Sequence, residues 1–146
     1  MKIASIDAGV NTGLVICSYI IRVGHVVLRP ELVTTCQTSQ ALEIVDVLDR
    51  RKCKRVVLER MPDYGNPHGK QLYQGLLQYY AAGNYDAFVK ARMPLAFLVA
   101  PSEWKPFMKH RLGLLPSCET QHEKDALAML FYFFQVNHPD KRVLYE

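Results

Sequence analysis

Three acidic side chains stand where their types and spacing could support chemistry. Asp7 ends a short apolar run just before a glycine-containing turn, and Glu59 ends a second apolar run. Asp125 lies three residues after His122, a spacing that places both on one face of a helix. Carboxylates with one imidazole suit Mg²⁺ or Mn²⁺, and two such ions can position a water and stabilise the leaving oxygen of a phosphodiester. The pattern therefore favours metal-dependent hydrolysis of phosphodiester bonds.

Each of these residues also has an ordinary interpretation. Asp7 could be a solvated residue at the bend of a hairpin, and Glu59 could be plain surface. His122 could lie on the surface near a helix cap, and Asp125 could simply complement the positive end of a helix dipole. The metal-site hypothesis therefore depends on the conjunction of all four residues.

The elements that must position these groups begin with a strand, a tight turn and a second strand. Residues 3–7 and 14–21 are apolar and flank Gly9, Thr12 and Gly13. The two glycines allow backbone angles that are closed to other residues, and Thr12 supplies a small hydroxyl. A turn of this kind displays the carboxylate that precedes it.

The remainder of the chain predicts a third strand and then alternating helices and strands. A strand over residues 24–28 completes an antiparallel meander, and residues 31–38 are expected to be irregular or extended. Helices are predicted from residue 39 or 40 to about 51 and over 69–82, 84–90, 101–109 and 120–136; strands over 55–59 and 95–99; loops over 60–68 and 112–119.

Two helix starts carry capping signals. Ser102 is a plausible cap for the helix over residues 101–109. Thr120 and Glu123 have the spacing of a capping box, in which each side chain satisfies a free backbone donor.

Together the predicted strands and helices indicate one α/β domain over residues 1–146. Its sheet is expected to be mixed, with a three-strand antiparallel meander plus parallel strands, and to be flanked by helices.

Composition limits the function classes. The chain has 146 residues and is 49% hydrophobic, which supports a packed core and excludes a disordered tail. The net charge of +4 permits a polyanionic partner without requiring one. The longest apolar run, residues 126–134, is too short to cross a membrane as a helix.

The cysteines and the N-terminus bear on the compartment. The four cysteines are widely spaced with no C-x-x-C pair, so they are expected to be free thiols in a reducing environment. The N-terminal residues read as a strand and lack a signal-peptide pattern. These features favour a soluble protein in the cytoplasm of a bacterium or of a phage-infected cell, with no membrane partner.

The ordered set of motifs resembles a known family. The DAGVNTG turn, the strand-end Glu59, the PSEWK segment and the HEKDA sequence occur in this order. The set is similar to that of the RuvC-type Holliday junction resolvases of the ribonuclease H-like superfamily, and most to the short versions carried by bacteriophages. The resemblance covers about residues 1–134.

This resemblance implies roles for five residues. Asp7, Glu59 and Asp125 match the acids that hold two Mg²⁺ ions, for which Mn²⁺ is expected to substitute. His122 would ligate a metal or orient the attacking water. Lys105 matches a lysine near the scissile phosphate. The family implies a homodimer that binds a four-way DNA junction and nicks two opposed strands symmetrically.

The resemblance also points to DNA-binding and dimer residues. Met61 and Tyr64 are candidates for a wedge that holds the junction open, and Tyr64 is preferred; the alternative is an ordinary surface loop. The helix over residues 69–82 is expected at the dimer interface, or else simply packs on the sheet. The candidates for contacts to the DNA backbone are Lys70, Lys105, Lys109, His110 and Arg111.

Three other functions remain open at this point. A related ribonuclease H-like nuclease could act on other branched DNA or on an RNA–DNA hybrid. A module that kept the fold could bind branched DNA without cutting it. An actin-like or sugar-kinase ATPase shares the glycine turn, but it needs two such domains and a second phosphate-binding turn, which 146 residues do not show.

Overall fold

The computed structural model describes residues 1–62 and 65–146 of the chain. The strands within these ranges form one sheet in the order β5-β6-β4-β1-β2-β3-β7. The strands are β1 (Lys2–Asp7), β2 (Thr12–Arg22), β3 (His25–Cys36), β4 (Arg55–Glu59), β5 (Ala81–Ala82), β6 (Leu95–Val99) and β7 (Arg142–Tyr145). The helices are α1 (Ala41–Arg50), α2 (Pro67–Tyr79), α3 (Tyr85–Lys90), α4 (Pro101–Met108) and α5 (Gln121–Asn137), with a 3₁₀ turn at Leu112–Leu114.

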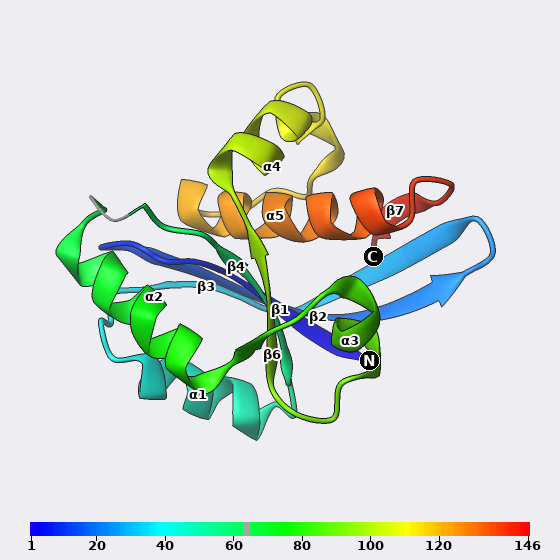
Figure 1. The fold of residues 1–146 in the computed structure, drawn as a ribbon. Helices are drawn as coiled ribbons and strands as arrows, with labels where there is room; N and C mark the ends of the chain where they lie inside the picture. The colour runs from blue at the N-terminus through cyan, green and yellow to red at the C-terminus, as the bar shows by residue number, and fades with distance from the viewer. Residues whose placement is uncertain (63–64) are drawn as a thin grey trace.

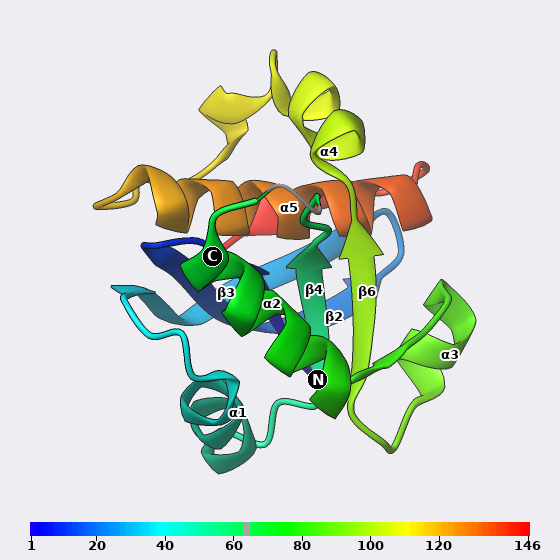
Figure 2. The ribbon, with the colours of Figure 1, turned by 60° about the vertical axis from the view of Figure 1, so that its left-hand side comes forward.

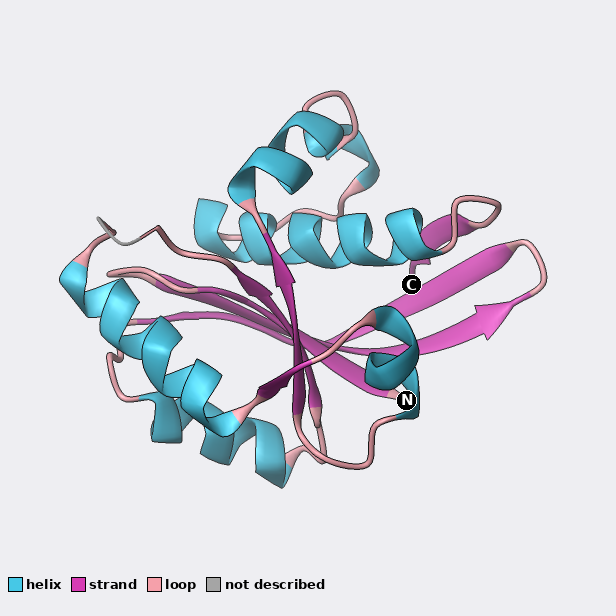
Figure 3. Cartoon of the chain, viewed as in Figure 1, coloured by secondary structure: helices cyan, strands magenta, loops and turns pink. Residues whose placement is uncertain are grey.

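The sheet is mixed, as the sequence predicts. Strands β1, β2 and β3 form the antiparallel meander. Strand β4 pairs parallel with β1 and β6, β5 pairs parallel with β6, and β7 pairs parallel with β3. Figure 3 shows the strands crossing the middle of the molecule with helices on both sides. The predicted fold class is therefore confirmed.

Helices cover both faces of the sheet and enclose two cores. Helix α5 lies across one face, and α1 and α2 lie across the other (Figure 1). The core under α5 includes Ile3, Val57 and Phe133, whereas the core under α1 and α2 includes Ile6, Leu58 and Leu72. Helix α4 follows β6 and packs on the outer side of α5, as Figure 2 shows. Helix α5 thus lies between the sheet and α4, which explains why its sequence is apolar almost all round.

Strand β3 is longer than predicted. It pairs with β2 from His25 to Cys36, whereas the sequence predicts a strand only over residues 24–28 followed by an irregular or extended segment. Pro30 has no N–H to donate to a neighbouring strand, but it lies beside the β-bulge between Ile16 and Cys17, where the ladder is already interrupted. The pairing therefore resumes beyond the proline.

The chain near α2 and the C-terminus also differs from the prediction. Helix α2 begins at Pro67 and ends at Tyr79, because Tyr80 adopts an extended conformation and the next two residues pair with β6 as β5. Strand β7, which the sequence analysis missed, adds to the free edge of β3. Both differences come from long-range pairing, which local propensity does not encode.

The start of helix α4 differs from the prediction, whereas the state of the cysteines does not. Helix α4 begins after Ala100 instead of at Ser102, and the Glu103 carboxylate accepts a hydrogen bond from the Ala100 N–H at 3.1 Å. The four cysteines are free thiols, as expected. Within the described residues, no helix is both long and apolar enough to span a membrane.

Candidate active site

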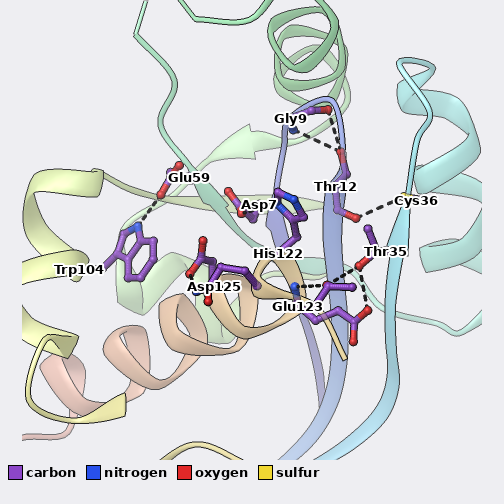
Figure 4. Close-up of polar contacts among 12 residues, drawn as sticks. Asp7, Gly9, Thr12, Thr35, Cys36, Glu59, Trp104, His122, Glu123 and Asp125 are labelled. Atoms are coloured by element: carbon purple, nitrogen blue, oxygen red, sulfur yellow. Dashed lines mark hydrogen bonds and ion pairs between the residues drawn. The ribbon is translucent and has the colours of Figure 1, made fainter. Parts of the chain in front are cut away.

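Two of the predicted acids meet because their strands run in parallel. The register of β1 and β4 pairs Ile6 with Leu58, so Asp7 and Glu59 follow at the same edge of the sheet. The carboxyl ends of strands are where sites gather in open α/β sheets. The indole N–H of Trp104, on α4, donates a hydrogen bond to Glu59 Oε2 at 2.5 Å (Figure 4). Trp104 is buried and so holds the Glu59 carboxylate in a fixed orientation.

The first turn of α5 brings the other two predicted ligands to the same edge. The distance from His122 Nδ1 to Asp7 Oδ2 is 3.9 Å. Asp125 faces the same space (Figure 4). The Gln121 amide donates a hydrogen bond to Asp125 Oδ1 at 2.7 Å. A pocket of about 260 Å³ opens here, lined by Asp7, Ala8, Gly9, Val10, Asn11, Glu59, Lys105, His122 and Asp125. The structure therefore brings together all five side chains to which the sequence assigns catalysis.

Close packing explains Gly13 in the turn and Gly69 at the start of α2. Gly9 and Gly13 do not use the backbone freedom that glycine allows, since neither has a positive φ. A Cβ on Gly13 would lie 2.0 Å from the His122 carbonyl oxygen, and a Cβ on Gly69 would lie 2.7 Å from Gly9 Cα. Glycine thus lets the starts of α5 and α2 lie directly against the turn.

Side-chain hydrogen bonds complete this local structure. The Thr12 hydroxyl lies 3.3 Å from both the Gly9 N–H nitrogen and the Gly9 carbonyl oxygen, which closes the turn. Thr120 caps α5 by accepting a hydrogen bond from the Glu123 N–H at 3.1 Å. The second half of the predicted capping box does not form, because the Glu123 carboxylate bonds to Thr35 on β3 instead. Thr35, Trp104 and Gln121 are contacts that the sequence analysis did not foresee.

Burial and neighbouring acids raise the pKa values of Asp7 and Glu59. Burial, and then the charges of Glu59 and Asp125, raise the pKa of Asp7 to about 7, although Lys105 acts in the opposite direction. Burial also raises the pKa of Glu59, which the Trp104 hydrogen bond and Lys105 partly offset. The pocket therefore concentrates negative charge that a cation would neutralise.

The carboxylate oxygens that line the pocket are chemically suited to bind a divalent cation. Carboxylate oxygens from β1, β4 and α5 are hard ligands of the kind that Mg²⁺ prefers. Within residues 1–62 and 65–146, however, no three His, Cys, Asp or Glu side chains already form a metal-binding group. The carboxylates thus line one pocket but do not lie close enough together to form a ready-made metal site. Their roles as metal ligands remain a prediction.

The raised pKa of Asp7 predicts how the stability of the metal-free protein changes with pH. Its pKa is about 7 in the folded state against 3.8 ordinarily, so the folded state binds more protons between these values. The stabilisation is complete below about pH 4 and is lost as the pH rises through about 7. Asp7→Asn has no charge to bury, so we expect its stability to fall less, by up to about 4 kcal/mol, between pH 4 and pH 8.

Urea denaturation in EDTA at pH 4 and pH 8 measures this effect. Asp140→Asn is a suitable control, because Asp140 is exposed. Glu59 titrates in the same direction, so part of the slope should persist in Asp7→Asn. An unchanged pH dependence in Asp7→Asn would contradict the electrostatic account of the pocket.

The predicted DNA-binding residues lie in different places. Lys105 lines the pocket, with its ammonium 5.6 Å from the centre of the Trp104 ring. Lys105 and Lys109 also line a neighbouring groove of about 620 Å³ that shares Asp125 with the pocket. The guanidinium of Arg111 lies over the ring of Phe107 and bonds to the carbonyl of that residue.

The remaining candidates lie elsewhere. Lys70 lines a groove between α1 and α2 and does not line the acidic pocket. His110 is exposed and lines neither the pocket nor the neighbouring groove. Met61 precedes the undescribed segment, and the preferred wedge, Tyr64, lies outside the described residues.

Solved structures with a similar fold include several Holliday junction resolvases. RuvC of Thermus thermophilus matches with a TM-score of 0.63 and 19% identity, covering 96% of this chain and 98% of that one. The fowlpox virus Holliday junction resolvase matches with a TM-score of 0.55 and 14% identity, covering 95% and 99%. The yeast mitochondrial resolvase Ydc2 matches with a TM-score of 0.53 and 12% identity, covering 99% of this chain and 65% of that one.

These likenesses show the fold. The chain has the fold of RuvC and of other Holliday junction resolvases over nearly its whole length, as the motifs indicated. The Thermus thermophilus protein has also been solved in complex with a Holliday junction substrate, at a TM-score of 0.63 and 18% identity. No protein-family model matches the chain, and neither does any curated protein sequence.

Proposed function

We propose that the chain is a divalent-metal-dependent endonuclease that resolves four-way DNA junctions by nicking two opposed strands. The observation that carries this proposal is the pocket where Asp7, Glu59 and Asp125 converge from three separate elements beside Lys105. The fold is one that Holliday junction resolvases share. Junction DNA is polyanionic, which agrees with the net charge of +4. We place this activity in one domain, residues 1–146, and in the cytoplasm of a bacterium or a phage-infected cell, where free thiols persist.

Each side chain has a role that its position supports. Asp7, Glu59 and Asp125 would hold two Mg²⁺ or Mn²⁺ ions, which supply an activated water and neutralise the leaving oxygen. Trp104 keeps Glu59 oriented, and the hydrogen bond from Gln121 does the same for Asp125. These contacts reduce the reorganisation that binding requires.

His122 and Lys105 act on the substrate side of the pocket. The His122 imidazole is 42% exposed, so it can reach both a ligand and solvent, as orientation of a water requires. The Lys105 ammonium supplies positive charge to a non-bridging oxygen of the scissile phosphate. Lys109, in the adjoining groove, would contact the DNA backbone.

A homodimer through α2 would place two such pockets on one junction. The groove between α1 and α2 has a volume of about 630 Å³ and includes Leu42 and Tyr79, which are 73% and 40% exposed. Exposed apolar side chains of this size suit a protein interface. Measurement of the mass in solution, with Leu42→Glu as the variant expected to dissociate the dimer, tests this part of the proposal.

The metal requirement tests the proposed function. We expect the protein to nick a synthetic four-way junction in Mg²⁺ or Mn²⁺ and to bind the same junction without nicking it in EDTA. Lys105 offsets the raised pKa values of Asp7 and Glu59 only in part, so we expect catalysis to depend on added metal. Equal nicking in EDTA would contradict the proposal.

A further inference from the structure

Glu123 is a buried carboxylate that the proposed mechanism does not use. The residue is 4% exposed and lies between His122 and Asp125 in sequence. A buried carboxylate is costly unless it is hydrogen-bonded. Its location beside two proposed metal ligands therefore needs an explanation.

A closed ring of hydrogen bonds holds this carboxylate. The Thr35 hydroxyl donates to Glu123 Oε2 at 2.8 Å. Because that hydroxyl has one proton, Thr120 must be the donor in the contact of 2.7 Å between the two threonine hydroxyls. Thr120 in turn accepts from the Glu123 N–H at 3.1 Å. The ring therefore joins the start of α5 to the end of β3 (Figure 4).

The ring lies in line with the candidate active site. The strand registers pair Asp7 with Gly13 and Gly13 with Thr35, so these residues form a row across β1, β2 and β3. The backbone of His122 lies directly over Gly13, in the middle of the row. The first turn of α5 thus crosses the row with Glu123 over Thr35 at one end and His122 near Asp7 at the other.

We infer that Glu123, Thr35 and Thr120 form a clamp that positions the first turn of α5 so that His122 and Asp125 face Asp7. Gly13 lets the helix backbone lie close to β2 but has no side chain that could hold the helix in place. The hydrogen bonds of the clamp fix the position of the helix along the row. Displacements of about 1 Å in a ligand can cost on the order of 100-fold in rate. The inference rests on the proposed function for what the positioned groups do, but the positioning itself can be measured without it.

Thr35→Val tests the clamp, because valine has the shape of threonine and lacks the hydroxyl that makes both bonds. We expect Mn²⁺ affinity of the DNA-free protein to fall about 10-fold or more, in the range seen when groups that orient metal ligands are removed. The rate of junction cleavage at saturating DNA should fall by a similar factor, whereas junction affinity in EDTA should not change. Thr35→Ser keeps the hydroxyl and should restore both quantities.

Asn84→Ala is the matched control for a loss of stability alone. The Asn84 side chain caps α3 by accepting a hydrogen bond from the Ala87 N–H at 2.9 Å, and α3 does not line the pocket. Loss of a cap costs about 1 kcal/mol. This variant should lower the melting temperature yet leave Mn²⁺ affinity and cleavage as they are.

Amide hydrogen exchange in EDTA separates the clamp from the proposed function. In Thr35→Val we expect faster exchange in the first turn of α5, with later turns protected as in the wild type, and no such change in Asn84→Ala. Unchanged protection of that turn, or Mn²⁺ affinity that Thr35→Val lowers no more than Asn84→Ala does, would overturn the clamp. A wild-type protein that neither binds Mn²⁺ nor cuts would refute the proposed function, while the exchange data would still decide whether the clamp positions the helix.

Discussion

Asp7→Asn is expected to lower junction cleavage by about 1000-fold or more and to leave junction binding intact. Asp7 interacts with several other groups of the pocket: Glu59 and Asp125 both raise its pKa, and His122 lies 3.9 Å away. Asparagine keeps the shape but removes the charge that a divalent cation needs. Loss of a single preorganised electrostatic group can cost 100- to 1000-fold, and loss of a carboxylate that is proposed to hold the metal should cost at least as much.

Loss of folding would not account for this result. The uncharged side chain should make the metal-free protein more stable above pH 7, because burial and neighbouring charges disfavour the ionised Asp7 carboxylate. Single-turnover cleavage and binding to the same junction, measured with Asp140→Asn in parallel, separate catalysis from affinity. Cleavage by Asp7→Asn within 10-fold of the wild-type rate would show that catalysis does not depend on the Asp7 carboxylate.

Gly13→Ala is expected to have the second largest effect, because it acts on the position of the whole first turn of α5. The added Cβ would lie 2.0 Å from the His122 carbonyl oxygen, whereas real contacts of this kind exceed 3.0 Å. The helix start or the strand must therefore move by about 1 Å, through contacts that are otherwise closely packed. We expect a loss of stability of about 1–3 kcal/mol, as for other overpacked sites, together with loss of cleavage.

Gly113→Ala is the control for this substitution. A Cβ at Gly113 would meet nothing within 4 Å, and Gly113 likewise has no positive φ. Urea denaturation and cleavage at a temperature where both variants remain folded measure the two effects. A Gly13→Ala protein with wild-type stability and cleavage would show that the close approach of α5 to β2 does not matter.

Much of the site could be predicted from the sequence because each acid carries its own local signal. Asp7 and Glu59 end apolar runs that read as strands, and His122 and Asp125 share a helical face. Parallel pairing of β1 with β4 then brings the two strand ends together. The order of the motifs along the chain predicted that the four residues belong to one site, which no single motif indicated.

The contacts that hold the site in place could not be predicted in this way. Thr35 lies in a segment whose pairing with β2 resumes only after a bulge, so its register with Gly13 depends on the whole meander. The spacing of Thr120 and Glu123 indicates a capping box, yet the Glu123 carboxylate finds Thr35 because the helix packs on β3. Trp104 meets Glu59 from a distance of 45 residues along the chain. Such partners follow from tertiary packing, which local patterns do not contain.

Product mapping on a synthetic four-way junction tests the central claim most directly. The junction, a linear duplex and an RNA–DNA hybrid would be incubated with the protein in Mg²⁺, Mn²⁺ or EDTA, with each strand labelled in turn. We expect paired nicks at symmetric positions on two opposed strands of the junction, in either metal and not in EDTA. Cutting of the duplex or hybrid at an equal rate would contradict junction resolution and indicate a nuclease with a different substrate. Tight junction binding without cutting in any metal would contradict catalysis and indicate a DNA-binding module.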